Sequence, residues 1–138
     1  MTPEETRLPM RSHDEALVGN KTEAIDEIYA EDFFNRTPGL PDSMRYGREA
    51  VREQYRLLHA AFSDMKITNG DPVVEGDLIG FRWEFEAKHT GLFFGMPATN
   101  KTVSIEGYDI IQVRGGKIRA AWIYQDLASL LQQIQPPA

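Results

Sequence analysis

Cysteine is absent from the 138 residues of this chain. Its absence excludes disulfide bonds, thiolate metal ligands and a cysteine nucleophile, and it is typical of proteins from a reducing compartment. Histidine is scarce, and His13, His59 and His89 do not have the spacing of metal ligands. A glycine-rich phosphate loop is also lacking. We therefore expect neither a metal site nor a nucleotide-binding loop.

Basic clusters and long apolar runs are lacking too. The net charge is -6 at pH 7 and the isoelectric point is about 5.0, whereas a nucleic-acid partner requires clustered lysine and arginine. No apolar run approaches the roughly 20 residues that span a bilayer, and the first residues, MTPEETRLPMRSHDE, contain no apolar signal segment. We expect a cytoplasmic protein with a single domain over residues 1–138 and no nucleic-acid or membrane partner.

The sequence does contain strands with regular alternation. Over residues 78–89 every second side chain is apolar or aromatic, and alternate side chains of a strand lie on the same face. The predicted inner face of this strand consists of Ile79, Phe81, Trp83, Phe85, Ala87 and His89. A histidine therefore ends an aromatic face.

The last predicted strand repeats this arrangement with a carboxylate. Its alternate residues are Ile118, Ala120, Trp122, Tyr124 and Asp126. A histidine and an aspartate that each end an aromatic strand face indicate an apolar pocket that contains acid–base groups.

The first third of the chain has helical patterns. Asn20 to Glu23 has the form of a capping box that opens a short helix through Tyr29, after an earlier helix that ends near Leu17. A further helix follows Gly47, with apolar residues at helical spacing: Val51, Tyr55, Leu58 and Phe62. Strands are predicted over residues 65–68, 72–75, 78–89, 103–113 and 118–124, and a last helix over residues 127–133. Helices that precede an antiparallel meander predict an α+β fold with helices on one face of the sheet.

Several strings resemble the SnoaL-like polyketide cyclase family, which shares a cystatin-like cone fold with ketosteroid isomerases and nuclear-transport-factor-like proteins. These strings are GREAVREQYRLLHAAFSDM, the strand that ends in KHTG, FGMPAT, GYDI, GKI, and Trp122 followed by Asp126 and LLQQ. The likeness covers about residues 14–135. It implies a cone in which a strongly curved, mixed or antiparallel sheet wraps around the N-terminal helices.

The resemblance also implies a function. Cyclases of this family are cofactor-free homo-oligomers in which an aspartate before the final helix acts as acid–base catalyst of an intramolecular aldol ring closure. Asp126 stands at that place. A polar pair in the first half that often contains histidine in such proteins is Asn35-Arg36 here, which leaves the substrate open. We expect a homodimer that binds a small apolar or aromatic ligand.

Three residues are candidates for catalysis: Asp126, His89 and Asp109. Asp126 could act as general base in an apolar surrounding, or it could cap the helix that follows. His89 could donate a hydrogen bond to a substrate carbonyl, or it could fix the next loop. Asp109 interrupts an apolar strand face, where it would be either a second acid or an internal strut that must find partners.

The candidates for substrate binding are one amide and several aromatic residues. Asn35 could bind the substrate, or its side chain could order its own loop. The aromatic residues belong to the core by default, and a subset of them would form pocket walls because cones of this kind are rarely filled completely. They are Tyr55, Trp83, Phe85, Trp122 and Tyr124.

Two classes of function are consistent with these patterns. The first is a SnoaL-like enzyme with cyclase, isomerase, dehydratase or epoxide hydrolase chemistry, in which Asp126 is the base and His89 and Asp109 stabilise the enolate oxygen. The second is a non-catalytic module for ligand binding or dimerisation. The sequence alone does not separate them.

Overall fold

The computed structural model describes residues 1–135. Its helical segments are α1 (Pro3–Arg11), the π-helix η1 (Ser12–Val18), α2 (Ala24–Ile28), the 3₁₀ helix η2 (Asp42–Met44), α3 (Gly47–Ala61) and α4 (Leu127–Ile134). Its strands are β1 (Tyr29–Asn35), β2 (Phe62–Asn69), β3 (Val73–Glu75), β4 (Leu78–His89), β5 (Thr102–Arg114) and β6 (Lys117–Gln125).

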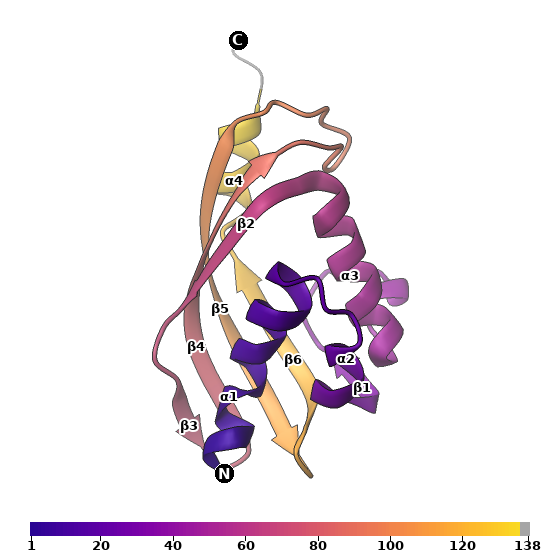
Figure 1. The fold of residues 1–138 in the computed structure, drawn as a ribbon, viewed down its shortest axis with the longest axis vertical. Helices are drawn as coiled ribbons and strands as arrows, with labels where there is room; N and C mark the ends of the chain where they lie inside the picture. Colours follow the sequence, from indigo (N-terminus) through magenta and orange to yellow (C-terminus); the bar gives the residue numbers. More distant parts are fainter. Residues whose placement is uncertain (136–138) are drawn as a thin grey trace.

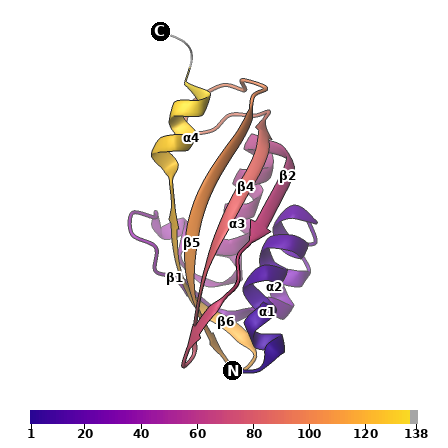
Figure 2. The same ribbon diagram turned by 90° about the vertical axis from the view of Figure 1, so that its left-hand side faces the viewer.

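The strands form one sheet in the order β1-β6-β5-β4-β2, and β3 pairs with β4. β1 runs parallel to β6, and the other neighbours are antiparallel. Helices α1, α2 and α3 lie together against one face of the sheet (Figure 1), and the turned view shows the curvature of the long strands, with α4 at the end of the molecule opposite the amino terminus (Figure 2). The predicted α+β fold with a curved mixed sheet around N-terminal helices is confirmed.

The alternation in β4 determines which face of the sheet the helices cover. All six residues of the predicted inner face are buried, and Phe81 is 1% exposed. Arg82, Glu84 and Glu86 alternate with them and are exposed. Burial of each large apolar side chain of this row contributes about 1.5–3 kcal/mol. The predicted bounds of this strand agree with those of β4.

The prediction of helix through Tyr29 is wrong, because Tyr29 begins the strand β1. Burial along β1 does not alternate regularly, since its register with β6 shifts between Tyr29 and Phe34. The irregularity removes the period-two pattern by which a strand is recognised. The predicted capping box is wrong as well: Asn20 has a left-handed φ of 53°, and Glu23 precedes α2 without a capping side-chain bond.

The predicted inner face of the last strand is wrong beyond its first residue. The register between β5 and β6 shifts near the start of β6, which bulges there. Ile118 faces inward. Trp122, however, lies opposite Ile110, and Tyr124 lies opposite Tyr108, on the outer face of the sheet. A bulge of one residue moves every later side chain to the other face.

The final helix closes an open edge of β5. Gln133 lies beyond the end of β6. Its side-chain oxygen accepts a hydrogen bond from the backbone nitrogen of Ser104 at 2.9 Å, and its side-chain nitrogen donates one to the carbonyl oxygen of Ser104 at 2.7 Å. One side chain thus reproduces the pair of bonds that a neighbouring strand would make. Leu130 and Ile134 of the same helix are buried.

Gly107 on β5 leaves the space that Trp83 occupies on the inner face. A Cβ atom at Gly107 would lie 2.0 Å from Cζ2 of the indole. We therefore expect Gly107→Ala to lower the free energy of unfolding by about 1–3 kcal/mol, as overpacking of a core does. Urea denaturation of the purified variant measures this loss.

Gly80→Ala is the matched control for this substitution. Its Cβ atom would meet the hydroxyl oxygen of Tyr108 at 2.5 Å, but that side chain is 39% exposed and can move away. Equal losses for both variants would contradict the packing role of Gly107.

Candidate functional site

Asp109 lies at the centre of a polar group on the inner face of the sheet. Its position on β5 directs it inward, where it is 3% exposed. Nε1 of Trp83 donates a hydrogen bond to Oδ1 at 2.8 Å, and Nε2 of His13 lies 3.4 Å from Oδ2. A buried carboxylate requires such partners, because an unpaired buried charge is strongly destabilising.

His13 comes from η1, the π-helix that follows α1. Its side chain is 12% exposed, and its ring packs against Phe81 and Trp83 with centroid distances of 5.5 and 6.2 Å. Its other nitrogen, Nδ1, lies 2.8 Å from Oδ1 of Asn69 at the end of β2. π-helical turns are rare and occur frequently at functional sites.

Ser12, the neighbour of His13, joins two buried phenols. Its hydroxyl lies 2.7 Å from that of Tyr29 and 2.6 Å from that of Tyr55. Burial raises the pKa of Tyr29 well above its ordinary value, and the neighbouring Tyr55 and Asp109 raise it further. Burial, opposed by the hydrogen bonds, also raises the pKa of Tyr55, and Asp109 contributes to this rise. Both phenols therefore remain neutral hydrogen-bond donors close to Asp109.

These contacts place a carboxylate, an imidazole, an indole and two phenols together in an apolar surrounding. The carboxylate of Asp109 can take a proton, His13 can hold or return one, and the neutral phenols and the indole N–H offer hydrogen bonds to a developing negative charge. Electrostatic interactions are stronger in such an interior than in water.

Asp126 lies elsewhere, on the outer side of the sheet. Its exposed side chain accepts a hydrogen bond from the backbone nitrogen of Ser129 at 3.0 Å and so caps α4. Its backbone nitrogen donates to the carbonyl oxygen of Glu106 at 3.0 Å. This is the helix cap that the sequence predicts as the alternative to a catalytic role for Asp126.

His89 occupies the far end of β4, about 26 Å along the strand from Phe81 at 3.3 Å per residue. It is fully buried. Nδ1 lies 3.0 Å from the hydroxyl of Thr99 and accepts a hydrogen bond from the backbone nitrogen of the same residue at 3.3 Å. Nε2 has no partner within residues 1–135. Asp109, Asp126 and His89 are therefore not brought together.

The predicted substrate-binding residues divide between the two faces. Trp83 is bonded to Asp109, and Tyr55 is bonded to Ser12. Phe85 is a core residue whose ring packs edge-on against that of Phe62. Asn35 is buried, and its amide oxygen accepts a hydrogen bond from the backbone nitrogen of Thr37 at 3.0 Å, which orders the loop. Trp122 and Tyr124 lie on the outer face.

Sequence reasoning did not identify Ser12, His13, Tyr29 or Asn69 as members of the site. One signal was present for Ser12, because Leu8, Ser12 and Ala16 recur every four residues and all three are buried. A hydroxyl on an otherwise apolar helical face indicates a buried partner. No comparable pattern marks Asn69, since only the tertiary fold brings it to His13.

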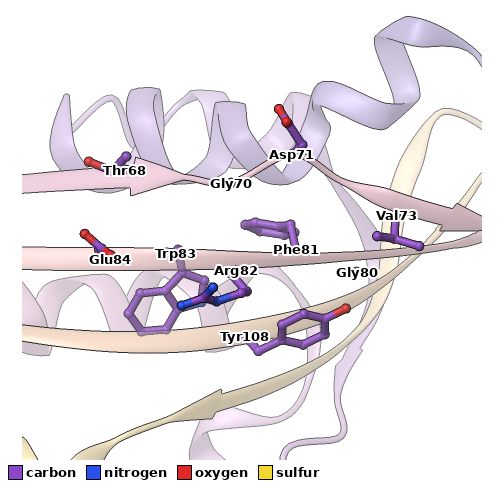
Figure 3. Close-up of a pocket in the computed structure, with 10 residues that line it drawn as sticks. All are labelled: Thr68, Gly70, Asp71, Val73, Gly80, Phe81, Arg82, Trp83, Glu84 and Tyr108. Atoms are coloured by element: carbon purple, nitrogen blue, oxygen red, sulfur yellow. The ribbon is translucent and has the colours of Figure 1, made fainter.

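A groove with a volume of about 410 Å³ lies where β2 leaves β4, and the inner-face residues Phe81 and Trp83 contribute to its lining. The other side chains that line it include Thr68, Asp71, Arg82, Glu84 and Tyr108 (Figure 3). Arg82 is paired with Glu106 at 3.2 Å. The two carboxylates that line the groove, Asp71 and Glu84, are exposed, whereas Asp109 is buried.

Neither a metal cluster nor a membrane-spanning helix is found in the part of the chain that the structure describes. Within residues 1–135, no three histidine or carboxylate side chains gather closely enough to hold a metal ion. In the same range, no helix has both the length and the apolar character needed to cross a bilayer.

Comparison with protein families gives one match over most of the chain. The family model described as SnoaL-like polyketide cyclase matches residues 8–134. Comparison with curated proteins gives no match.

Solved structures with the same fold cover nearly the whole chain. TsrD from Streptomyces laurentii is 23% identical with a TM-score of 0.85, and 97% of each chain is covered. A candidate SnoaL-like polyketide cyclase from Jannaschia sp. CCS1 is 17% identical with a TM-score of 0.87, covering 100% of this chain and 98% of the other. IdmH from Streptomyces antibioticus, a candidate polyketide cyclase, is 27% identical with a TM-score of 0.79, covering 96% and 98%.

The raised pKa of Tyr29 predicts a loss of stability in alkaline solution. In the unfolded chain a tyrosine ionises near pH 10, about its ordinary pKa, whereas the folded chain keeps Tyr29 protonated. The stabilisation is complete below about pH 10 and is lost as the pH rises above it, by up to about 1.4 kcal/mol per pH unit for each such group. Urea denaturation from about pH 8 to about pH 11 should give a shallower decline for Tyr29→Phe than for the unchanged chain.

Tyr46→Phe is the control, because the side chain of Tyr46 is 67% exposed whereas that of Tyr29 is buried. A decline with pH that is identical in Tyr29→Phe and the unchanged chain would show that Tyr29 ionises without cost in the folded protein.

Proposed function

Because the chain belongs to the SnoaL-like polyketide cyclase family, we propose that it is an enzyme that uses Asp109 as general acid and base on a small apolar or aromatic carbonyl compound. The proposed reaction is an intramolecular aldol ring closure or a related isomerisation or dehydration. The likeness to IdmH, itself a candidate cyclase, supports this class of reaction. The observation that carries the proposal is the carboxylate of Asp109, buried between two nitrogen groups.

The proposed chemistry needs a base held against the carbon next to a carbonyl group. Asp109 takes the proton from this carbon, and the electron pair of the C–H bond moves into the enolate. The enolate carbon attacks a second carbonyl group of the same molecule and forms a carbon–carbon bond. Protonated His13 gives its proton to the resulting alkoxide, and the proton on Asp109 then passes to His13.

Asp126 and His89 stay predictions as catalytic residues, and the geometry favours Asp109 over both. The carboxylate of Asp126 is exposed and engaged in capping α4. His89 is bonded to Thr99 at the other end of β4. Among the predicted binding residues, we propose Trp83 and Tyr55 as walls of the pocket, because both adjoin the inner polar group.

Access to Asp109 requires movement of η1 in this proposal. The carboxylate is 3% exposed, and the ring of His13 lies over Phe81 and Trp83. His13 belongs to the only π-helical segment within residues 1–135. A shift of this segment would open the inner face and carry His13 to the substrate.

A non-catalytic ligand-binding role is the second candidate. It is favoured by the way in which the inner polar groups satisfy one another: the indole N–H is bonded to Asp109, and the serine joins both phenols. In that role the same groups would stiffen the interior. Turnover decides between the two candidates.

Exchange of hydrogen for deuterium provides a test that does not require the natural substrate. A base that removes a proton next to a carbonyl group introduces deuterium there in deuterated water, and β-tetralone and aryl β-diketones are suitable probes. We expect the unchanged protein to accelerate this exchange and Asp109→Asn to lower the acceleration by about 100-fold or more. Mass spectrometry of the recovered probe measures the incorporated deuterium.

Asp126→Asn is the matched control, because asparagine caps a helix as well as aspartate does. Its exchange rate should equal that of the unchanged protein. Loss of exchange in Asp126→Asn but not in Asp109→Asn would transfer the role of base to Asp126. Failure of the unchanged protein to accelerate exchange of any probe would favour the ligand-binding role.

We also propose a homodimer that pairs the outer faces of two sheets. Tyr108 and Tyr124 lie opposite each other in the register, next to the pair of Ile110 and Trp122. The two tyrosines are 39% and 48% exposed, so this apolar area is open for a second copy. Light scattering at micromolar concentration should give twice the mass of 15.7 kDa, and Tyr124→Glu should give the monomer mass. A monomer mass for the unchanged chain would refute the dimer.

A further inference from the structure

We propose that Asn69 is a positioning residue that keeps a proton on Nδ1 of His13, so that Nε2 is the ring nitrogen that exchanges a proton with Asp109. The role of this arrangement in turnover rests on the function proposed above. The assignment of the proton to Nδ1 does not depend on that function, and it is tested separately.

The contact of Asn69 with Asp14 sets the direction of the amide. The amide nitrogen of Asn69 donates to Oδ1 of Asp14 at 3.4 Å, and its oxygen lies 2.8 Å from Nδ1 of His13. If the amide were turned around, its oxygen would face the carboxylate of Asp14, and both are acceptors. The acceptor end therefore points at His13, and Nδ1 must be the donor.

The proton on Nδ1 determines what the other nitrogen can do. In neutral imidazole one nitrogen carries the proton and the other is an acceptor. With Nδ1 protonated, Nε2 presents a lone pair to Oδ2 of Asp109 at 3.4 Å unless a further proton is present. Nε2 is therefore the ring nitrogen that exchanges a proton with Asp109 in the proposed reaction.

This arrangement suits the transfer of a proton in both directions. Oδ1 of Asp109 is occupied by the indole N–H of Trp83, so Oδ2 is the oxygen that faces the proton. A distance of 3.4 Å is long for a direct hydrogen bond, and such contacts often shorten when a substrate is bound. The hydrogen bond of Nδ1 to Asn69 fixes the orientation of the ring, and this orientation directs Nε2 toward Asp109.

The other two histidines of the chain have the opposite arrangement. Nε2 of His59 lies 2.7 Å from the carbonyl oxygen of Leu17, which can only accept, so Nε2 carries the proton. Nδ1 of His89 accepts from the backbone nitrogen of Thr99, so its proton is again on Nε2. Among the three histidines, His13 alone is assigned a proton on Nδ1 in its neutral form.

Long-range proton–nitrogen NMR of isotope-labelled protein tests this assignment directly. We expect the chemical shift of Nδ1 of His13 to be that of a protonated nitrogen, while His59 and His89 in their neutral forms give the shift of an unprotonated Nδ1. Those two residues serve as internal references. An unprotonated Nδ1 in His13 of the unchanged protein would overturn the proposal without any variant.

Three variants identify the cause. Asn69→Leu removes the acceptor and should abolish the uniform protonation of Nδ1, whereas Asn69→Asp retains an acceptor and should preserve it. Lys66→Ala, on an exposed position of the same strand, should leave the spectrum of His13 unchanged. A spectrum of Asn69→Leu identical to that of the unchanged chain would overturn the role of Asn69.

Deuterium exchange then tests the consequence for turnover. We expect Asn69→Leu to lower kcat at least about tenfold with little change in KM, as loss of the correct tautomer does, and Asn69→Asp to restore part of the rate. An unchanged kcat in Asn69→Leu, in a protein whose exchange depends on Asp109, would overturn the positioning role in catalysis. If the unchanged protein exchanges no probe, the proposed function fails while the assignment of the ring nitrogens stands on the NMR result.

Discussion

The burial of one carboxylate is the constraint on which the inner face of this protein depends. Asp109 stands in a row of apolar residues, where a charge without partners would cost several kcal/mol. The hydrogen bond from Trp83 at 2.8 Å satisfies one oxygen. That bond in turn requires Gly107, because any side chain there would collide with the indole. The second oxygen is left for a group that only the N-terminal segment supplies.

Two consecutive residues of η1 connect this segment to four elements of the fold. Ser12 is bonded to Tyr29 at the start of β1 and to Tyr55 of α3. His13 contacts Asp109 of β5 and Asn69 of β2. The wider turn of a π-helix changes the direction in which successive side chains point relative to an α-helix. The segment that covers Asp109 therefore also supplies its histidine partner. In the proposed function, movement of η1 would change access and proton transfer together.

The sequence predicts the architecture better than it predicts the site. β4, α3 and the final helix follow from local patterns, since alternation, helical spacing and a cap are properties of neighbouring residues. Asp109 could be recognised as a carboxylate out of place on an apolar face. The contacts made through His13 could not be recognised, because His13 and Asn69 are separated by 56 residues and meet only in the folded chain.

Because of the bulge in β6, the position of Asp126 along the chain does not by itself indicate the face of the sheet on which it lies. Asp126 follows an aromatic strand and precedes the last helix, as the resemblance to the family requires. A shift of one residue between β5 and β6 nevertheless places the end of this strand on the outer face, and the inward position opposite Asp109 is taken by Ile123. The inner carboxylate is then the one on β5. For chemistry inside the cone we therefore propose the carboxylate that the sheet register turns inward, although it lies on another strand than the resemblance implies.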